Sequence, residues 1–150
     1  MPEILASILL VDDDPNVEAT CAALLRTEGY EVVSCSKLAL AREQLRKRRF
    51  DLVIAEQAFD EPGDGLQLLV DAQRSGRSGS IVLTSYGSEH AEGLAQEMGI
   101  RHYLSKPCSI DLLRHTVRQA LAEALPPGER RVSEDALGAP RPTPMERAGN

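Results

Sequence analysis

The stretch ILLVDDDP at residues 8–15 is the part of the sequence that decides the fold. Its four apolar residues predict a buried strand, and the acidic residues after them mark the end of that strand. Asp14 is suited to cap a helix whose first residue would be Pro15. An apolar run followed by polar residues and a helical pattern recurs along the chain, and such strand–helix repetition predicts a parallel α/β sheet.

Strands are expected at residues 8–11, 30–35, 51–56, 80–83 and 102–104. Helices are expected from Pro15 to just before Gly29, and then over about 37–48, 65–74, 88–98 and 109–125. Short connections and right-handed crossovers leave few topologies for these units. The sequence therefore predicts a flavodoxin-like, doubly wound five-stranded parallel sheet of order 2-1-3-4-5.

The helix expected at 88–98 has the weakest pattern. Its apolar stripe consists only of Ala91, Leu94, Ala95 and Met98. Gly93 lies inside it, and an internal glycine weakens a helix by about 1 kcal/mol relative to alanine. We therefore expect this helix to be the most mobile element.

Residues 1–125 are expected to form one folded domain, since a chain of 150 residues suits a single domain with or without a tail. Residues 126–150 contain few large apolar residues and many prolines, glycines and charges. That composition predicts a disordered tail or linker.

The net charge of −6 argues against nonspecific binding to nucleic acid or to an anionic membrane. The basic run RKRR at 46–49 is expected to complement the negative end of its helix. No stretch is long and apolar enough to cross a bilayer, and the amino terminus lacks the basic residues of a signal peptide. Cys21, Cys35 and Cys108 form no CxxC pair, so we interpret them as buried or half-buried residues of a cytoplasmic protein.

Polar residues follow four of the expected strands directly, and these residues are Asp12, Asp13, Glu56, Thr84 and Lys106. The carboxyl ends of parallel strands meet at one edge of a sheet, so these side chains should converge. Three carboxylates, a hydroxyl and an ammonium suit a divalent cation and a phosphoryl group. The sequence predicts a metal site at Asp12, Asp13 and Glu56, beside an anion pocket at Thr84 and Lys106.

With these residues placed, residues 7–124 resemble the receiver domain of bacterial two-component response regulators. The resemblance rests on the order and spacing of ILLVDDDP at 8–15, DLVIAE at 51–56, DG at 64–65, IVLTS at 81–85 and YLSKP at 103–107. It implies a signalling module that takes a phosphoryl group on an aspartate after the third strand. The implied partners are a histidine kinase, a phosphotransfer protein, a downstream effector or a second copy of the chain.

The resemblance also implies a role for individual residues. Asp12 and Asp13 would hold Mg²⁺, with Asp13 as the direct ligand. Thr84 and Lys106 would bind phosphoryl oxygens, Tyr103 would change rotamer with Thr84, and the bond before Pro107 would be cis.

The implied contact face is built from the fourth helix, fifth strand and fifth helix. The residues expected on or near it are Arg101, Tyr103, Arg114 and Arg118.

Glu56 departs from the family pattern, because it stands where the phosphoaccepting aspartate is expected. The following loop departs too: Pro62 and Gly65 lie further from position 56 than the family pattern places them, and the loop is interpreted as one residue longer. The extra methylene of glutamate would move its carboxylate about 1 Å further into the pocket, and a misplacement of that size can cost about a hundredfold in rate. Glu56 would then pair with Lys106 or accept a hydrogen bond from Thr84.

Three hypotheses remain open at this point. Glu56 is a permanent partial mimic of a phosphorylated residue in a protein-binding module; or the pocket is vestigial and the fold is a scaffold or dimerisation unit; or another acid such as Asp60 accepts phosphate. None of the three turns over an external substrate. A flavin enzyme on the same fold is disfavoured, since the loop DDDPN at 12–16 would repel a phosphate.

Overall fold

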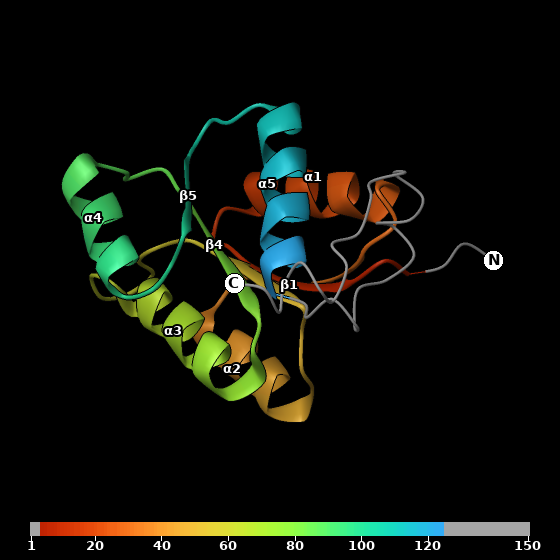
Figure 1. The fold of residues 1–150 in the computed structure, drawn as a ribbon, viewed down its shortest axis with the longest axis horizontal. Helices are drawn as coiled ribbons and strands as arrows, with labels where there is room; N and C mark the ends of the chain where they lie inside the picture. The colour runs from red at the N-terminus through yellow and green to blue at the C-terminus, as the bar shows by residue number, and fades with distance from the viewer. Residues whose placement is uncertain (1–3, 125–150) are drawn as a thin grey trace, which may run out of the picture.

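The computed structural model describes residues 4–124, and these form a five-stranded parallel sheet of order β2-β1-β3-β4-β5 (Figure 1). The predicted fold class and strand order are confirmed. The strands are β1 (Ser7–Val11), β2 (Glu31–Cys35), β3 (Leu52–Ala55), β4 (Gly79–Thr84) and β5 (His102–Ser105). The expected tail at 126–150 lies outside the described residues.

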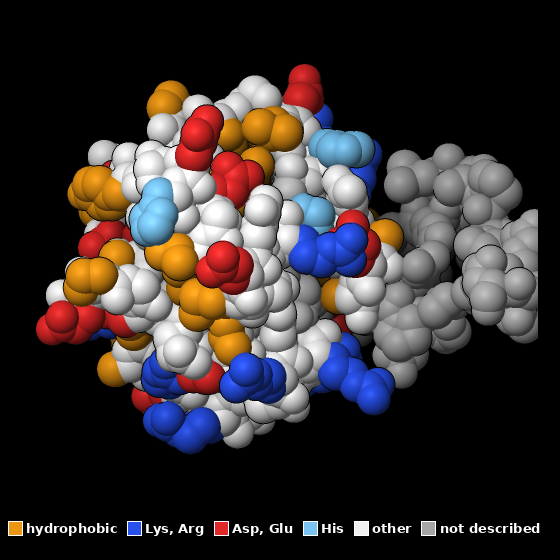
Figure 2. Space-filling view, turned by 60° about the vertical axis from the view of Figure 1, so that its left-hand side comes forward, with side chains coloured by type: hydrophobic (Ala, Val, Ile, Leu, Met, Phe, Trp, Pro, Cys, Tyr) orange, Lys and Arg blue, Asp and Glu red, His pale blue; other side chains and the backbone are white. Residues whose placement is uncertain are grey.

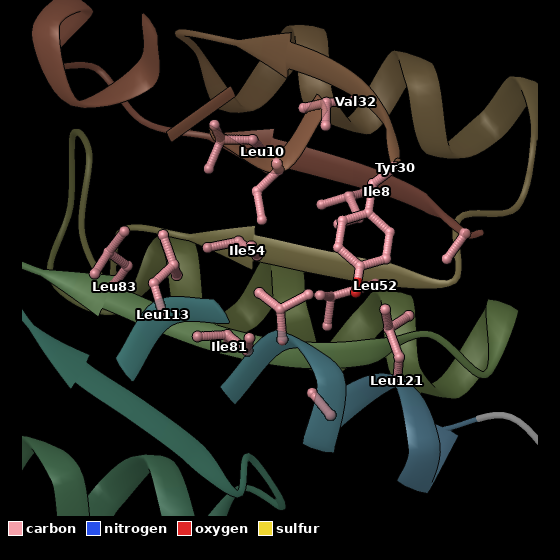
Figure 3. Close-up of a cluster of buried hydrophobic side chains, with 14 of the residues drawn as sticks. Ile8, Leu10, Tyr30, Val32, Leu52, Ile54, Ile81, Leu83, Leu113 and Leu121 are labelled. Atoms are coloured by element: carbon pink, nitrogen blue, oxygen red, sulfur yellow. The ribbon is translucent and has the colours of Figure 1, made fainter. Parts of the chain in front are cut away.

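The five helices cover both faces of the sheet. They are α1 (Pro15–Thr27), α2 (Leu38–Lys47), α3 (Asp64–Gly76), α4 (Glu89–Glu97) and α5 (Ile110–Ala124). One core packs α1 and α5 against one face through Leu25, Leu113 and Val117, and Figure 3 shows part of it around Ile8 and Ile54. The other core packs α2, α3 and α4 against the opposite face.

Polar caps begin several helices where the sequence predicts them. The Asp14 carboxylate accepts hydrogen bonds from the backbone N–H groups of Asn16 and Val17, and Pro15 is the first residue of α1. Ser109 Oγ accepts from Leu112 N at 3.0 Å at the start of α5. These bonds satisfy N–H groups that the first turn of a helix leaves without partners. These two caps therefore fix where α1 and α5 leave the carboxyl edge of the sheet.

Helix α4 buries less of its predicted stripe than the sequence suggested. Ala95 is buried, whereas Leu94 and Met98 are 43% and 37% exposed, so only part of the predicted apolar stripe packs against the sheet. The helix lies at the β5 side of the sheet, on the face that also carries α2 and α3 (Figure 1). A helix near the edge of a sheet is covered by it only in part, so Leu94 and Met98 remain exposed.

Gly65 lets the first turn of α3 approach the end of β3. A Cβ atom at this position would overlap the carbonyl oxygen of Glu56, and Gly65 N donates to the carbonyl oxygen of Gln57 at 3.0 Å. No helix among residues 4–124 is long and apolar enough to cross a membrane.

Two glycine-to-alanine substitutions test this packing. We expect Gly65→Ala to lower the free energy of unfolding by about 1–3 kcal/mol, because the added methyl group has no room. Gly93→Ala is the matched control: no atom lies within 4 Å of its added Cβ, so it should raise stability by about 1 kcal/mol. Urea unfolding followed by circular dichroism measures both, and a neutral Gly65→Ala variant would contradict the close approach.

Candidate functional site

Asp12, Glu56 and Lys106 meet at the carboxyl edge of the sheet. Lys106 Nζ lies 2.6 Å from Asp12 Oδ2 and 3.2 Å from Glu56 Oε1. Asp12 and Glu56 are buried to 1% and 2% exposure, so two carboxylates share one ammonium group with little water around them. The ends of β1 and β3 are thereby joined to the segment after β5.

The Glu56 carboxylate is also held by backbone groups. Its Oε2 accepts a hydrogen bond from Gln57 N at 2.8 Å, and its Oε1 accepts from Ser85 N at 3.3 Å. Sequence reasoning missed Ser85 and Gln57. Ser85 directly follows β4 and Gln57 is the second residue after β3, where backbone N–H groups leave the sheet ladder, and this position was the signal that would have found them.

Thr84 lies at the end of β4 and is fully buried. Its Oγ1 accepts a hydrogen bond from Tyr86 N at 3.1 Å, and its carbonyl oxygen accepts from Lys106 N at 2.7 Å. Ser85 N, rather than the Thr84 hydroxyl, supplies the bond to Glu56 from this loop. Thr84 therefore acts on the loop through its bond to Tyr86, and the neighbouring residue, Ser85, makes the contact with Glu56.

Tyr103 is half-buried on β5, and its hydroxyl group donates to Gln57 Oε1 at 2.7 Å. Gln57 Nε2 donates in turn to the carbonyl oxygen of Tyr86 at 3.1 Å. Burial raises the pKa of Tyr103, so its hydroxyl stays protonated and remains a donor at neutral pH. The hydroxyl group of the tyrosine predicted as a switch is thus bonded to Gln57, and it also has a hydrogen bond with the backbone of Ser88.

Asp13 does not complete a three-carboxylate cluster. It is exposed, and among residues 4–124 no group of three or more histidine, cysteine or acidic side chains is placed to hold a metal ion. Asp12 and Glu56 instead face the Lys106 ammonium group. The Lys106 ammonium group lies between them and offsets one of their two negative charges.

Burial and charge pairing act on these groups in opposite directions. Burial raises the pKa of Asp12, and the hydrogen bond from Lys106 opposes the rise. Burial disfavours the charged form of Lys106, but the hydrogen bond and charge of Asp12, with those of Glu56, outweigh it and raise the pKa of Lys106. The ammonium group therefore stays protonated and holds the two acids together.

The loop between β3 and α3 is arranged by Asp64. Its carboxylate accepts hydrogen bonds from the backbone N–H groups of Phe59, Asp60 and Glu61. Several N–H donors outweigh burial and lower the pKa of Asp64. Asp60, the alternative acceptor, is exposed on this loop.

Two arginines lie elsewhere than expected. Arg114 Nε and Arg118 Nη2 are 3.0 Å and 3.3 Å from Glu28 Oε1, so both side chains of α5 reach toward the end of α1. Placing them on the face of α4, β5 and α5 was therefore wrong. The Glu28 carboxylate attracts both arginines because it carries the opposite charge. The sequence pattern of α5 alone does not reveal that Glu28 lies close to them.

Comparison with curated proteins identifies relatives of this chain. Transcriptional regulatory protein GlrR of Escherichia coli (strain K12) is 34% identical over 131 residues, which are 86% of this chain and 29% of that protein. Alginate biosynthesis transcriptional regulatory protein AlgB of Pseudomonas putida is 33% identical over 147 residues, which are 92% of this chain and 32% of that protein. The chain thus spans about a third of the length of these relatives.

Solved structures share the fold. A receiver domain protein (CheY-like) from Methanospirillum hungatei JF-1 matches with a TM-score of 0.73 and 25% identity, over 80% of this chain and 96% of that one. The beryllofluoride-activated NtrC4 receiver domain dimer matches with a TM-score of 0.72 and 26% identity, over 79% of this chain and 98% of that one. The response regulator receiver domain family matches residues 8–118. With this match, the strand order and the relatives in agreement, the chain belongs to the response regulator receiver domains, the signalling modules of two-component systems.

Proposed function

We propose that this chain is an atypical receiver that signals through protein contact, without phosphoryl transfer to position 56. The observation that carries the proposal is the Glu56 carboxylate, which lies in the pocket and contacts both Lys106 Nζ and Ser85 N. A phosphorylated residue at this position would offer oxygens to the same two kinds of donor. Glu56 supplies a permanent negative charge there, although one carboxylate is weaker than the charge of about −1.5 to −2 on a phosphate.

Phosphoryl transfer to Glu56 is disfavoured by geometry. A nucleophilic carboxylate oxygen must be free and in line with the phosphorus atom. Both Glu56 oxygens already accept hydrogen bonds, and the longer side chain is displaced by about 1 Å from an aspartate position. The module is therefore proposed to have no catalytic step of its own.

The pocket as arranged does not fit Mg²⁺. Carboxylates are suitable ligands for this ion, but Lys106 lies against Asp12 and Glu56 where a cation would bind, and Asp13 is exposed. The proposed signal is carried by the Glu56 carboxylate and its contacts with Lys106 and Ser85, and it includes no metal.

A second candidate is a phosphorylatable response regulator that uses a nearby acid. The similarity to GlrR and AlgB, both named transcriptional regulatory proteins, favours it. Asp60 is the nearest candidate acceptor, because it is exposed on the loop that follows β3. A vestigial scaffold or dimerisation domain is the third candidate, and it predicts that changing the charge at position 56 has no effect on partner binding.

The proposed contact surface is the exposed side of α4 with the loop before it. Leu94, Met98 and Tyr86 are 43%, 37% and 73% exposed. Figure 2 shows the side on which α4 lies, with hydrophobic side chains spread among acidic ones. A structurally similar protein, the NtrC4 receiver domain, is described as a dimer, so a second copy of this chain is the first partner to test, ahead of a kinase, a phosphotransfer protein or an effector.

We also propose a cytoplasmic location. All three cysteines are free thiols, as expected in a reducing compartment.

Replacing Lys106 tests the charge balance. Lys106→Met leaves two buried carboxylates without their cation, so we expect a loss of about 3–5 kcal/mol in unfolding free energy at pH 7. The folded-state pKa of Asp12 is already raised, and removing the ammonium raises it further. A carboxyl group whose pKa is raised by folding stabilises the folded state at pH values below its unfolded-state pKa of about 3.9. This stabilisation is lost as the pH rises through its folded-state pKa. The deficit should therefore shrink as pH falls toward about 4.

The matched control neutralises the whole cluster. The triple variant Asp12→Asn, Glu56→Gln, Lys106→Met should recover most of the stability, because no buried charge is left unpaired. Urea unfolding at several pH values measures all three proteins. A Lys106→Met deficit that does not depend on pH would contradict the charge argument.

Phosphodonor treatment tests the missing transfer step. With acetyl phosphate and Mg²⁺, the intact mass of the native protein should not increase, because Glu56 replaces the acceptor. Glu56→Asp should gain one phosphoryl group if the loop after β3 is competent, and an unreactive Asp variant would implicate that loop. A phosphoryl group that is added to the native protein and lost in Asp60→Asn would establish the second candidate instead.

Substitution on α4 tests the contact surface. Leu94→Glu should move the monomer–dimer midpoint to roughly tenfold higher concentration, the effect of about 1.4 kcal/mol of lost apolar burial. Leu40→Glu is the control, since Leu40 is 46% exposed on α2 over another part of the sheet. Sedimentation velocity across a concentration series measures both variants. Equal shifts in the two variants would contradict a specific surface on α4.

A further inference from the structure

Gln57 connects the charged pocket to two segments that lie outside it. Its backbone N–H donates to Glu56 Oε2 at 2.8 Å. Its side-chain oxygen accepts from the Tyr103 hydroxyl group at 2.7 Å, and its side-chain nitrogen donates to the carbonyl oxygen of Tyr86 at 3.1 Å. One residue thus links the end of β3 to β5 and to the loop before α4.

We propose that Gln57 is the positioning residue that holds Tyr103 and the loop between β4 and α4 in one arrangement. The inference deepens the proposed function and rests on it, since it names the residue through which the charge at Glu56 reaches the contact surface.

The loop is held by two consecutive residues of the segment after β3. Glu56 accepts from Ser85 N at 3.3 Å, and Gln57 donates to the carbonyl oxygen of Tyr86 at 3.1 Å. Tyr86 N is bonded to Thr84 Oγ1 at 3.1 Å, which closes a turn within the loop. Because neighbouring backbone groups are fixed from two directions, the loop has little freedom to move while Gln57 stays bound.

Gly87, the residue that follows Tyr86, is packed against β5. A Cβ atom added at Gly87 would lie 2.6 Å from Ser105 Oγ and 3.3 Å from Tyr103 Cε1. The backbone of the loop therefore reaches the Tyr103 ring directly. Moving the loop and moving Tyr103 are consequently linked, because each occupies space that the other would need.

The Thr84 hydroxyl group does not supply this connection. It is bonded to Tyr86 N within its own loop, whereas the Tyr103 hydroxyl group is bonded to Gln57. The link from the pocket to the tyrosine therefore runs through Glu56 and Gln57, two adjacent residues that follow β3. It also sets the position of the Tyr86 ring, which is 73% exposed beside the start of α4.

The NMR signals of the tyrosine rings report directly on the positions of Tyr103 and of the loop before α4. The chain contains no tryptophan and three tyrosines, Tyr30, Tyr86 and Tyr103. In protein labelled with ¹³C-tyrosine, their ring resonances can be assigned with single Tyr→Phe variants. The ring shifts of Tyr103 report its packing, and those of Tyr86 report the loop.

Two substitutions separate the two bonds of the Gln57 side chain. Gln57→Leu keeps the approximate size and removes both bonds, so the Tyr103 and Tyr86 resonances should both move toward those of mobile, exposed tyrosines. Gln57→Glu keeps an oxygen for the Tyr103 hydroxyl group and loses the donor to Tyr86, so Tyr103 should stay near its native shift while Tyr86 moves. Gln119→Leu, on the exposed side of α5, is the control and should leave both unchanged.

A native Tyr103 shift in Gln57→Leu, with the amide spectrum intact, would overturn the proposal. If Gln57→Leu does not fold, Tyr103→Phe decides: the side-chain amide resonance of Gln57 must shift when its hydroxyl partner is removed, and an unchanged resonance rejects the link. These readouts are independent of phosphodonor chemistry. A native protein that gains a phosphoryl group on Glu56, yet shows the expected tyrosine shifts, rejects the proposed function and keeps the role of Gln57.

Discussion

The shared ion pair of Lys106 with Asp12 and Glu56 is the interaction on which the rest of the site depends. It joins the ends of β1 and β3 to the segment after β5 in a place with little water. A buried ion pair contributes little net stability, but losing one partner is costly because an uncompensated charge stays behind. The pair therefore constrains geometry: each of the three side chains has to remain where the other two place it.

The extra methylene of Glu56 becomes useful within this constraint. A carboxylate held by Lys106 on one side can still accept backbone hydrogen bonds from Ser85 and Gln57. It thereby organises the loop before α4 without any bound group. Gln57 extends these contacts outward to Tyr103, and we propose that the charge in the buried pocket acts on the exposed surface through them.

The local pattern of the sequence was sufficient to predict the architecture. The alternation of apolar runs and helical stripes, the caps at Asp14 and Ser109 and the glycines at chain reversals all indicate the same topology, and element boundaries differ from expectation by only a few residues. How much of the apolar stripe on α4 is buried could not be predicted, because helical periodicity identifies an apolar face but not the neighbour that covers it. Leu94 and Met98 have the right spacing for a core, and the end of the sheet offers them little to pack against.

The sequence by itself determined the fold, the edge of the sheet where the polar residues gather, and the unusual glutamate at position 56. Only the tertiary structure decided which atoms meet: Lys106 between two acids, Gln57 between Tyr103 and Tyr86, and Arg114 on Glu28. The physical reason is one of range. Strand and helix propensities act over a few neighbouring residues, whereas these partners are far apart in sequence and meet only after crossovers, packing and side-chain rotamers are all set.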